Sequence, residues 1–504
     1  MSNITPIILP LFSLGIVYFF CLGVLLLTQD KEEPPLALHS IPFLEPLIQL
    51  LIRKYKIWIY LRDRCNQPIS TIRLPGIRCY VIHNSSLVLA VDRSFQTLSF
   101  APIEASATAT TLGTTEATNE IMRRDPAGSN GHFTTFHRAV RPHLSPGWGL
   151  DGMVERALCV VGTCLSNTHN TSPQKVNFFG WVRHMVLLAT TEGEYGPGNP
   201  FRELAFEQAW FKFLPGVPIM AGGFFPYLFA RQSSYAREYL AQGFERYFRD
   251  GHHLNGCAAL LARMEHGVAA GLPASDRARG EIGYSMALVN NTVPAAFWLL
   301  HHVYRDAALL EECRRELSKA VQFEEDGTRT IHLAHVQSSC PTLNSTLHEV
   351  FRYYGIGTVL LRQVVQSHKL NNTYLLKKGS FVLMPNITQH YSPKVWGSDA
   401  NHFNPRRFCF IKRRNPAGMR VFGGGAILCP GRHFAENVIL AFAAQMLLRF
   451  DVQPANGVWS PMVMEETLGL GVAKVFLLPA CDPEVEVAAR APNEHVWRVR
   501  LPKG

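Results

Sequence analysis

The chain has 504 residues, of which 47% are hydrophobic, and a formal net charge of +10. A chain of this length and apolar content can bury a large core together with a cofactor pocket, and no linker rich in proline, glycine or serine divides its interior. The cationic residues are scattered and accompany no nucleic-acid-binding motif, which argues against a nucleic-acid partner. Eleven cysteines without a CxxC pair argue against a zinc module or a secreted disulfide framework.

Residues 1–30 predict a membrane anchor. No charged side chain precedes Asp30, and residues 7–27 form a mostly apolar run of 21 residues, which is long enough to cross a bilayer as a helix. Basic residues follow from Lys31 onward, so the positive-inside rule places the rest of the chain in the cytosol. A hydrophobic core helix is the alternative. If the anchor is present, Asn3 is the one glycosylation sequon on the lumenal side.

A proline-rich connector follows over residues 31–46, with prolines at positions 34, 35, 42 and 46. Such a composition favours a stiff, extended segment. The predicted organisation is therefore an anchor over 1–30, a hinge over 31–46 and one large domain over 47–504.

The large domain is predicted to be mainly helical with small sheets. Residues 70–82 are β-branched and aromatic around Pro75-Gly76, which predicts a hairpin, and residues 85–93 predict a helix. Residues 101–131 are rich in Ala, Thr, Ser and Gly, which favours a mobile loop. Helices are expected over most of 133–319, short strands over 364–384, and a late strand pair over 467–478.

Residues 282–304 predict a helix through the core, because the segment is uncharged until Arg305. Pro294 cannot donate to the carbonyl of Asn290, so we expect it to kink this helix. Asn291 and Thr292 lie at the expected kink. One interpretation of Asn291 and Thr292 is purely structural, namely that they are a polar pair that bends the helix and has no catalytic role.

Glu349 and Arg352 lie three residues apart in a second helical segment, residues 343–354, and share one face of it. An isolated pair of this kind means little, because ExxR occurs by chance in many helices. Downstream lies Phe403-Asn-Pro-Arg-Arg407-Phe408, which precedes a cysteine-containing loop.

That loop reads FGGGAILCPG over residues 422–431 and delivers Cys429 to the start of a predicted helix. The positive end of the helix dipole and the free N–H groups of the first turn would stabilise a thiolate there. Pro430 has no N–H, so the donors must belong to the residues after it, and the glycines allow close approach to a large flat group. This arrangement suits an axial sulfur ligand of haem iron. A buried, inert cysteine is the alternative.

The three motifs, in this order, resemble the signature of the cytochrome P450 family. Phe422, Gly425, Cys429 and Gly431 match its loop, whereas Ile427 stands where the family usually has an arginine that reaches a haem propionate. The stretch that begins at Asn291 resembles the branch holding the microsomal cholesterol 7α-hydroxylase, the sterol 12α-hydroxylase and prostacyclin synthase. The Cys-Pro-Gly-Arg-His-Phe-Ala sequence resembles fungal biosynthetic members.

The resemblance implies a P450 fold, mainly α with small β-sheets, behind one transmembrane helix. It also assigns roles to individual residues. Cys429 would be the axial ligand of haem b; Phe422, Gly425, Gly431, Arg362 and His390 would contact the haem, with Arg138 or Arg141 as further propionate partners; Thr292 and Asn291 would serve proton delivery; and Glu349, Arg352 and Arg407 would form a buried network that supports the cysteine loop.

The implied function is a monooxygenase of the endoplasmic reticulum membrane, single-pass and with a cytosolic catalytic domain. It would oxidise a hydrophobic sterol, terpenoid or polyketide-like molecule, in a biosynthetic pathway. NADPH electrons would arrive through a cytochrome P450 reductase, with cytochrome b5 as a second candidate partner. The reductase would dock on a basic cluster at Arg406, Arg407, Lys412, Arg413, Arg414 and Arg420, for which a plain solvated loop is the alternative. A reductase-independent haem-thiolate isomerase or dehydratase and a non-catalytic haem- or lipid-binding membrane protein are the alternatives.

Overall fold

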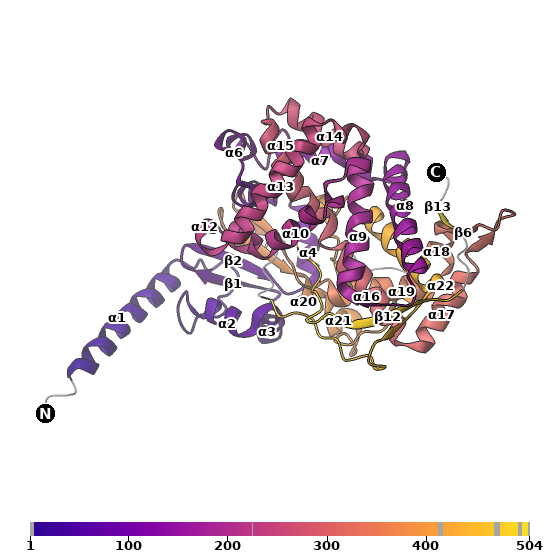
Figure 1. Ribbon diagram of the computed structural model, residues 1–504. Helices are drawn as coiled ribbons and strands as arrows, with labels where there is room; N and C mark the ends of the chain where they lie inside the picture. The colour runs from indigo at the N-terminus through magenta and orange to yellow at the C-terminus, as the bar shows by residue number, and fades with distance from the viewer. Residues whose placement is uncertain (1–4, 224, 412–416, 468–473, 492–495, 502–504) are drawn as a thin grey trace.

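Helices form most of the molecule, as the sequence predicts (Figure 1). The computed structural model describes residues 5–223, 225–411, 417–467, 474–491 and 496–501. The helices are α1 (Thr5–Leu27), α2 (Glu45–Arg53), α3 (Ile57–Arg64), α4 (Ser85–Arg93), α5 (Ala101–Thr108), α6 (Glu116–Arg123), α7 (His132–Val140), α8 (Trp148–Asn170), α9 (Phe178–Tyr195), α10 (Leu204–Phe213), α11 (Val217–Ala221), α12 (Pro226–Phe229), α13 (Arg231–Arg249), α14 (Ala258–Ala269), α15 (Ala274–Val289), α16 (Thr292–Arg305), α17 (Ala307–Ser318), α18 (Leu333–Ser339), α19 (Pro341–Tyr354), α20 (Asn386–His390), α21 (Pro393–Trp396) and α22 (Arg432–Arg449).

The strands form small sheets. The largest has the order β1-β2-β10-β7-β3, in which β10 pairs parallel to β2 and every other pairing is antiparallel. Its strands are β1 (Ile69–Leu74), β2 (Ile77–Ile82), β3 (Leu98–Ser99), β7 (Val359–Val364) and β10 (Phe381–Pro385). The other sheets are β11-β12-β4 (Phe450–Pro454, Glu484–Ala489, Gln174–Asn177), β13-β6-β5 (Trp497–Arg500, Arg329–His332, Val321–Phe323) and β8-β9 (His368–Leu370, Tyr374–Leu376).

Several predicted elements are confirmed. The hairpin of β1 and β2 turns at Pro75-Gly76, where Gly76 adopts a φ of 71° that only glycine tolerates readily. The helix over 85–93 is α4, and the predicted short strands include β8, β9 and β10. Of the predicted late strand pair, residues 468–473 lie outside the described part, and the described residues 474–478 form no strand.

The mobile loop predicted over 101–131 is wrong, because most of this segment is helical. It contains α5, a π-helical turn over Ala109–Gly113, and α6. Tertiary contacts override the weak helix propensity of its composition. The hydroxyl of Thr118 donates to Asp276 of α15 at 2.5 Å, and Arg279 of α15 donates to the carbonyl of Leu112 at 3.1 Å. These bonds hold the segment against α15.

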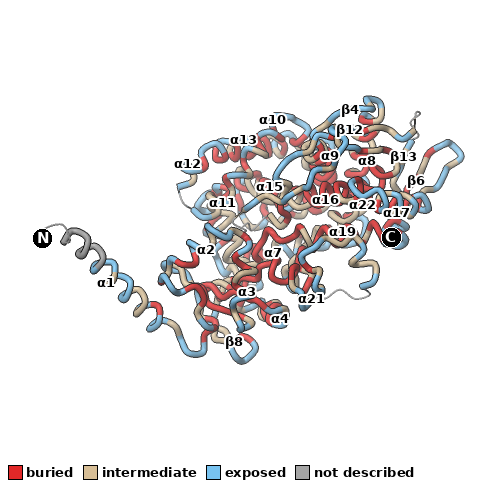
Figure 2. Tube along the Cα trace, turned by 90° about the horizontal axis from the view of Figure 1, so that it is seen from below, coloured by how far each residue is buried: buried red, intermediate tan, exposed pale blue. Residues whose placement is uncertain are grey.

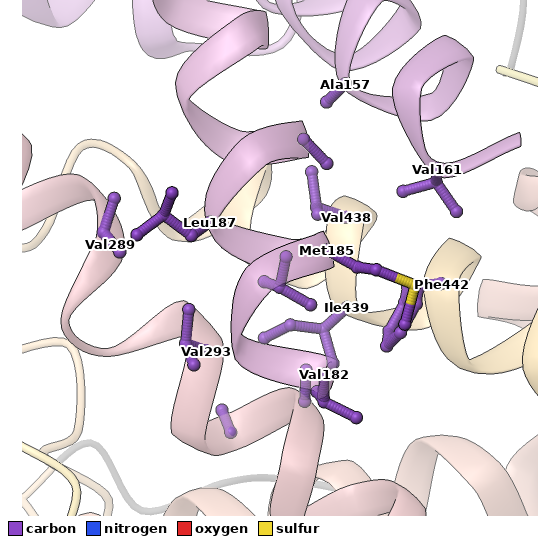
Figure 3. Packing of buried hydrophobic residues seen from close by; sticks show 14 of the residues in the cluster. Ala157, Val161, Val182, Met185, Leu187, Val289, Val293, Val438, Ile439 and Phe442 are labelled. Atoms are coloured by element: carbon purple, nitrogen blue, oxygen red, sulfur yellow. The ribbon is translucent and has the colours of Figure 1, made fainter. Parts of the chain in front are cut away.

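The centre of the core lies where α8, α9, α15, α16 and α22 meet (Figure 3). Val182 of α9, Val293 of α16 and Ile439 of α22 are almost fully buried there. Figure 2 shows the same concentration of buried residues along α9, α16 and α22. This packing fixes the start of α16 relative to α22, and the loop before α22 carries Cys429.

The N-terminal helix α1 projects away from the body (Figure 1). Its described side chains include exposed aromatic residues such as Phe19 and Phe20. No helix in the described part of the chain has both the length and the apolar content of a membrane span. The connector after α1 is not a free spacer, since Thr71 of β1 donates its N–H to the carbonyl of Pro35 and accepts at its carbonyl from the N–H of Ala37, both at 2.8 Å.

Candidate active site

Cys429 lies in a loop that closes on itself just before α22. Its N–H donates to the carbonyl of Phe422 at 2.9 Å, and the Phe422 ring packs edge-to-face on Phe351 of α19 with centroids 5.2 Å apart. The loop therefore rests directly on the helix that carries Glu349 and Arg352.

Backbone N–H groups at the start of α22 lie beside the Cys429 sulfur. Burial raises the pKa of the Cys429 thiol, while the N–H of Gly431, the Arg432 charge and the Arg432 N–H all act to lower it. These donors are the residues after Pro430, as the sequence predicts. A Cβ at position 431 would meet only this sulfur, at 4.0 Å, which is an ordinary contact, so the space beside the sulfur is open.

Gly424 and Gly425 are needed because side chains of the protein lie where their Cβ atoms would be. A Cβ on Gly424 would lie 2.1 Å from Nη1 of Arg420, and one on Gly425 would lie 2.9 Å from Cβ of Asp92. Gly425 also has a φ of 60°, a conformation that favours glycine. Gly424 and Gly425 thus make room for an ion pair beneath the loop, and the expectation that the loop glycines approach a flat group stays a prediction.

Glu349, Arg352 and Arg407 come together as one buried charge network. Arg352 donates Nε to Oε2 of Glu349 at 2.8 Å and Nη2 to Oε1 at 2.7 Å, and both side chains are fully buried. Arg407 donates Nε to the same carboxylate at 3.1 Å and pairs with Asp399 at 2.8 Å. Arg352 also donates to the carbonyls of His390 and Ala400, each at 2.7 Å, so the network ties α19 to the chain that leads towards the cysteine loop.

The single kinked helix predicted over 282–304 is instead two helices, α15 and α16, with the break at Asn290-Asn291. Pro294 thus occupies the first turn of a new helix, where a missing N–H costs nothing. The hydroxyl of Thr292 donates to the carbonyl of Leu288 at 3.0 Å. Oδ1 of Asn291 accepts from the N–H of Val475 at 2.8 Å, so this amide joins the break to a distant segment of chain.

Arg362 and His390 lie close to the loop, around Arg420. Nε2 of His390 accepts from the N–H of Arg420 at 2.8 Å, and burial lowers the pKa of His390 to about 3, with the positive charge of Arg352 acting in the same direction. Arg362 lies 3.8 Å from Asp92. Burial lowers the pKa of Arg362 to about 10; the Asp92 carboxylate acts against this shift and the Arg420 charge adds to it.

The two arginines near α7 differ in their contacts. Nη2 of Arg141 donates to the loop carbonyls of Ala426 and Leu428, at 3.2 and 3.3 Å. Arg138 instead donates to the carbonyl of Ser129 at 3.3 Å.

Only some of the residues in the predicted basic docking cluster lie on the protein surface. Arg406 is exposed and pairs with Glu312, whereas Arg407 belongs to the Glu349 network and Arg420 is 2% exposed. Lys412, Arg413 and Arg414 lie outside the described residues. Arg407 and Arg420 are therefore removed from the cluster, because buried carboxylates bind their charges.

Asp92 and Arg420 are the site residues that sequence reasoning missed. Asp92 is the penultimate residue of α4 and lies 328 positions before its partner. A pair separated this far along the chain produces no local sequence motif. In the sequence, Arg420 looks like one more member of the basic cluster. An apolar residue at position 427, in a loop that lacks a cation, is the one indirect signal.

Comparisons with known proteins identify the family and the fold. The family model described as cytochrome P450 matches residues 228–478. The cytochrome P450 monooxygenase nodJ of Hypoxylon pulicicidum is 28% identical over 446 residues, covering 86% of this chain and 85% of that protein. A cytochrome P450 monooxygenase of Gibberella zeae is 24% identical over 444 residues, covering 86% of this chain and 84% of that protein.

The solved structure of a retinoic acid-bound cyanobacterial CYP120A1 shares the fold. It superposes with a TM-score of 0.65 over 91% of this chain and 99% of that chain, at 18% identity. The chain belongs to the cytochrome P450 family. It is an oxidoreductase of the monooxygenase class, and the non-catalytic alternative is set aside.

The residues present fit the haem that the family implies. Cys429 offers a sulfur with two backbone donors and open space beside it. Arg362 and Arg420 provide buried positive charge next to the same loop, which suits the carboxylates of a haem.

Proposed function

We propose that this enzyme is a membrane-anchored haem-thiolate monooxygenase in which Cys429 is the axial ligand of haem b. The observation that carries the proposal is the half-buried Cys429 sulfur at the start of α22, with the N–H groups of Gly431 and Arg432 directed to it. Such donors stabilise a thiolate and moderate the electron density it gives to iron. Bound there, the haem supplies the oxygen-activating redox chemistry.

Thr292 is proposed to carry protons to the reacting oxygen. Its hydroxyl donates to the Leu288 carbonyl at 3.0 Å, which leaves oxygen lone pairs able to accept a hydrogen bond from a proton donor. Asn291 is proposed to position Thr292, because its amide holds the start of α16 against Val475. The role of Asn291 in proton delivery, expected from the sequence, stays a prediction beside this one.

The substrate is proposed to be a hydrophobic molecule of sterol, terpenoid or polyketide type that is oxidised in a biosynthetic pathway. The relative nodJ is a fungal monooxygenase, and retinoic acid is bound to the structural neighbour. In this chain, apolar residues such as Val289 at the end of α15, and the segment around Leu112 that packs on α15, suit an apolar molecule.

Electrons are proposed to come from NADPH through a cytochrome P450 reductase, with cytochrome b5 as a second partner. The apolar helix α1 is proposed to anchor the enzyme to the endoplasmic reticulum membrane, with the catalytic domain, residues 47–504, in the cytosol and residues 31–46 as the connector. Support for this arrangement comes from the uncharged N-terminal sequence and from the way α1 stands apart from the body (Figure 1).

A reductase-independent isomerase or dehydratase is the second candidate. It is favoured by one observation, namely that position 291 carries an amide hydrogen-bonded to Val475 rather than a carboxyl group.

The experiment has two parts. Metabolites that accumulate in a strain lacking the chain are isolated and supplied to the purified enzyme with NADPH, reductase and ¹⁸O₂. The monooxygenase proposal predicts a product with one ¹⁸O atom and strict dependence on NADPH. Conversion without NADPH and without label would establish the isomerase instead.

A further inference from the structure

Three buried charged side chains meet beneath the cysteine loop and carry more positive than negative charge. Arg420 donates Nη1 to Oδ2 of Asp92 at 2.6 Å and Nη2 to Oδ1 at 3.0 Å. Nη2 of Arg362 lies 3.8 Å from the same carboxylate. The side chains of Asp92, Arg362 and Arg420 are 8%, 4% and 2% exposed. One carboxylate therefore serves two guanidinium groups.

An uncompensated buried charge is costly unless another group neutralises it. Nε of Arg420 is buried and, within the described part of the chain, has no hydrogen-bond partner. Arg362 contacts the Asp92 carboxylate and donates a hydrogen bond to the carbonyl of Leu361 at 2.7 Å. The cluster thus has unused donors and a surplus positive charge, and both suit an added carboxylate.

The cluster is built into the loop that presents Cys429. Gly424 and Gly425 lie directly on Arg420 and Asp92, so closely that neither position has room for a side chain. The backbone of Arg420 is fixed from the other side, where its N–H donates to His390 and its carbonyl accepts from Asn386 at 3.3 Å. The guanidinium therefore has a defined place beside the loop, whereas Ile427 within the loop offers no charge.

We propose that Arg420, together with Arg362, binds a propionate carboxylate of the haem and supplies the cation that the loop lacks at Ile427. The inference rests on the proposed haem site at Cys429. In it, Asp92 orients Arg420 and neutralises one of the two positive charges, and the propionate neutralises the other. His390 and Asn386 are positioning residues that act through the Arg420 backbone.

The test measures how fast the purified holoenzyme loses haem to excess apomyoglobin. Arg420→Leu is expected to lose haem about ten- to a hundredfold faster than wild type, the range that one charge-assisted hydrogen bond contributes. Arg420→Lys is expected to fall between them, and Arg406→Leu, at an exposed arginine, serves as the control with the wild-type rate. The ferrous CO complex of the remaining Arg420→Leu holoenzyme should keep its thiolate-type absorption.

Asp92→Asn separates propionate binding from simple support of the loop. It breaks the same ion pair but leaves both arginines to the propionate, so haem loss is expected to be faster than in wild type, because Arg420 is less well oriented, but clearly slower than in Arg420→Leu. Haem loss as fast as in Arg420→Leu would overturn the proposal and make the pair a purely structural support. A wild-type rate in Arg420→Leu would overturn it as well.

The wild-type chain provides a second test if Arg420→Leu retains too little haem to measure. Enzyme reconstituted with haem dimethyl ester, whose propionates carry no charge, should lose its cofactor faster than enzyme reconstituted with haem. Equal rates would contradict propionate binding. Failure of the proposed function is distinct, because the wild-type ferrous CO complex would then lack the thiolate-type absorption.

Discussion

The carboxylate of Glu349 is surrounded by hydrogen-bond donors of the protein and is shielded from solvent. Two arginines and the N–H of Asn404, at 2.8 Å, converge on it, and its side chain is fully buried. In such a setting, loss of one partner leaves a buried charge uncompensated, which costs far more than a surface ion pair contributes.

Replacement of Arg352 by alanine is therefore expected to lower the free energy of unfolding by about 3–5 kcal/mol and to reduce haem content. The measurements are denaturant-induced unfolding and the haem-to-protein ratio. Arg406→Ala is the matched control, since this exposed arginine pairs with Glu312, and it should cost less than about 1 kcal/mol. Equal effects of the two substitutions would show that the network does not support the fold as described.

His390 makes stability depend on pH. Its pKa is lowered from 6.5 to about 3, chiefly by burial. Between these values the unfolded chain binds a proton that the folded chain excludes. The stability of the folded state that depends on neutral His390 is therefore complete above pH 6.5. It is lost as the pH falls below that value, at up to about 1.4 kcal/mol per pH unit.

His390→Gln keeps an acceptor for the Arg420 N–H but cannot titrate. We expect its melting temperature to fall less steeply than that of wild type between pH 7 and pH 5, the interval to be scanned. His83, His132 and His301, whose pKa values burial lowers to about 4, contribute equally to both proteins. Parallel curves would mean that folding does not lower the pKa of His390.

At the scale of elements, the break between α15 and α16 separates two roles that the sequence placed together. The hydroxyl of Thr292 donates to the carbonyl of Leu288, whereas the side-chain oxygen of Asn291 accepts from the N–H of Val475. The two neighbours should thus respond differently to substitution.

Thr292→Ala is expected to leave stability within about 1.5 kcal/mol of wild type but to divert NADPH electrons to hydrogen peroxide. Thr292→Ser, which keeps the hydroxyl, should retain coupling. Asn291→Ala should instead lower stability by about 1–3 kcal/mol, because the N–H of Val475 loses its acceptor. Peroxide yield per NADPH and thermal unfolding distinguish these outcomes, and uncoupling of Thr292→Ser as severe as that of Thr292→Ala would remove the hydroxyl from the proton route.

Elements with a strong local signal could be predicted from the sequence, and those decided by distant contacts could not. The β1–β2 hairpin and α4 follow from a Pro-Gly turn and a capped apolar pattern. The segment 101–131 is helical because α15 holds it through Asp276 and Arg279, which its small polar residues do not reveal.

The same distinction applies to the candidate site. Cys429 and the Glu349–Arg352 pair stand in recognisable local motifs. The Asp92–Arg420 pair joins residues 328 positions apart, so only the folded chain brings it to the cysteine loop.

At the scale of the whole molecule, the helix-rich body and the projecting α1 are separate parts (Figure 1). Deletion of residues 1–30 is expected to move the enzyme from the membrane to the supernatant in carbonate extraction while the ferrous CO spectrum is kept. The control is Leu51→Ser with Ile52→Ser, which removes two exposed apolar side chains of α2 and should leave the full-length enzyme in the membrane. A truncated enzyme that still resists extraction would place the anchor elsewhere.

The central claim is that one sulfur, presented by the loop before α22, defines the activity of the whole chain. The ferrous CO spectrum tests it most directly, with Cys429→Ser compared against Cys409→Ser, a half-buried cysteine outside the loop. We predict that Cys409→Ser keeps the thiolate-type absorption and that Cys429→Ser loses it even where haem is retained. A Cys429→Ser variant that kept this absorption would show that another residue holds the iron.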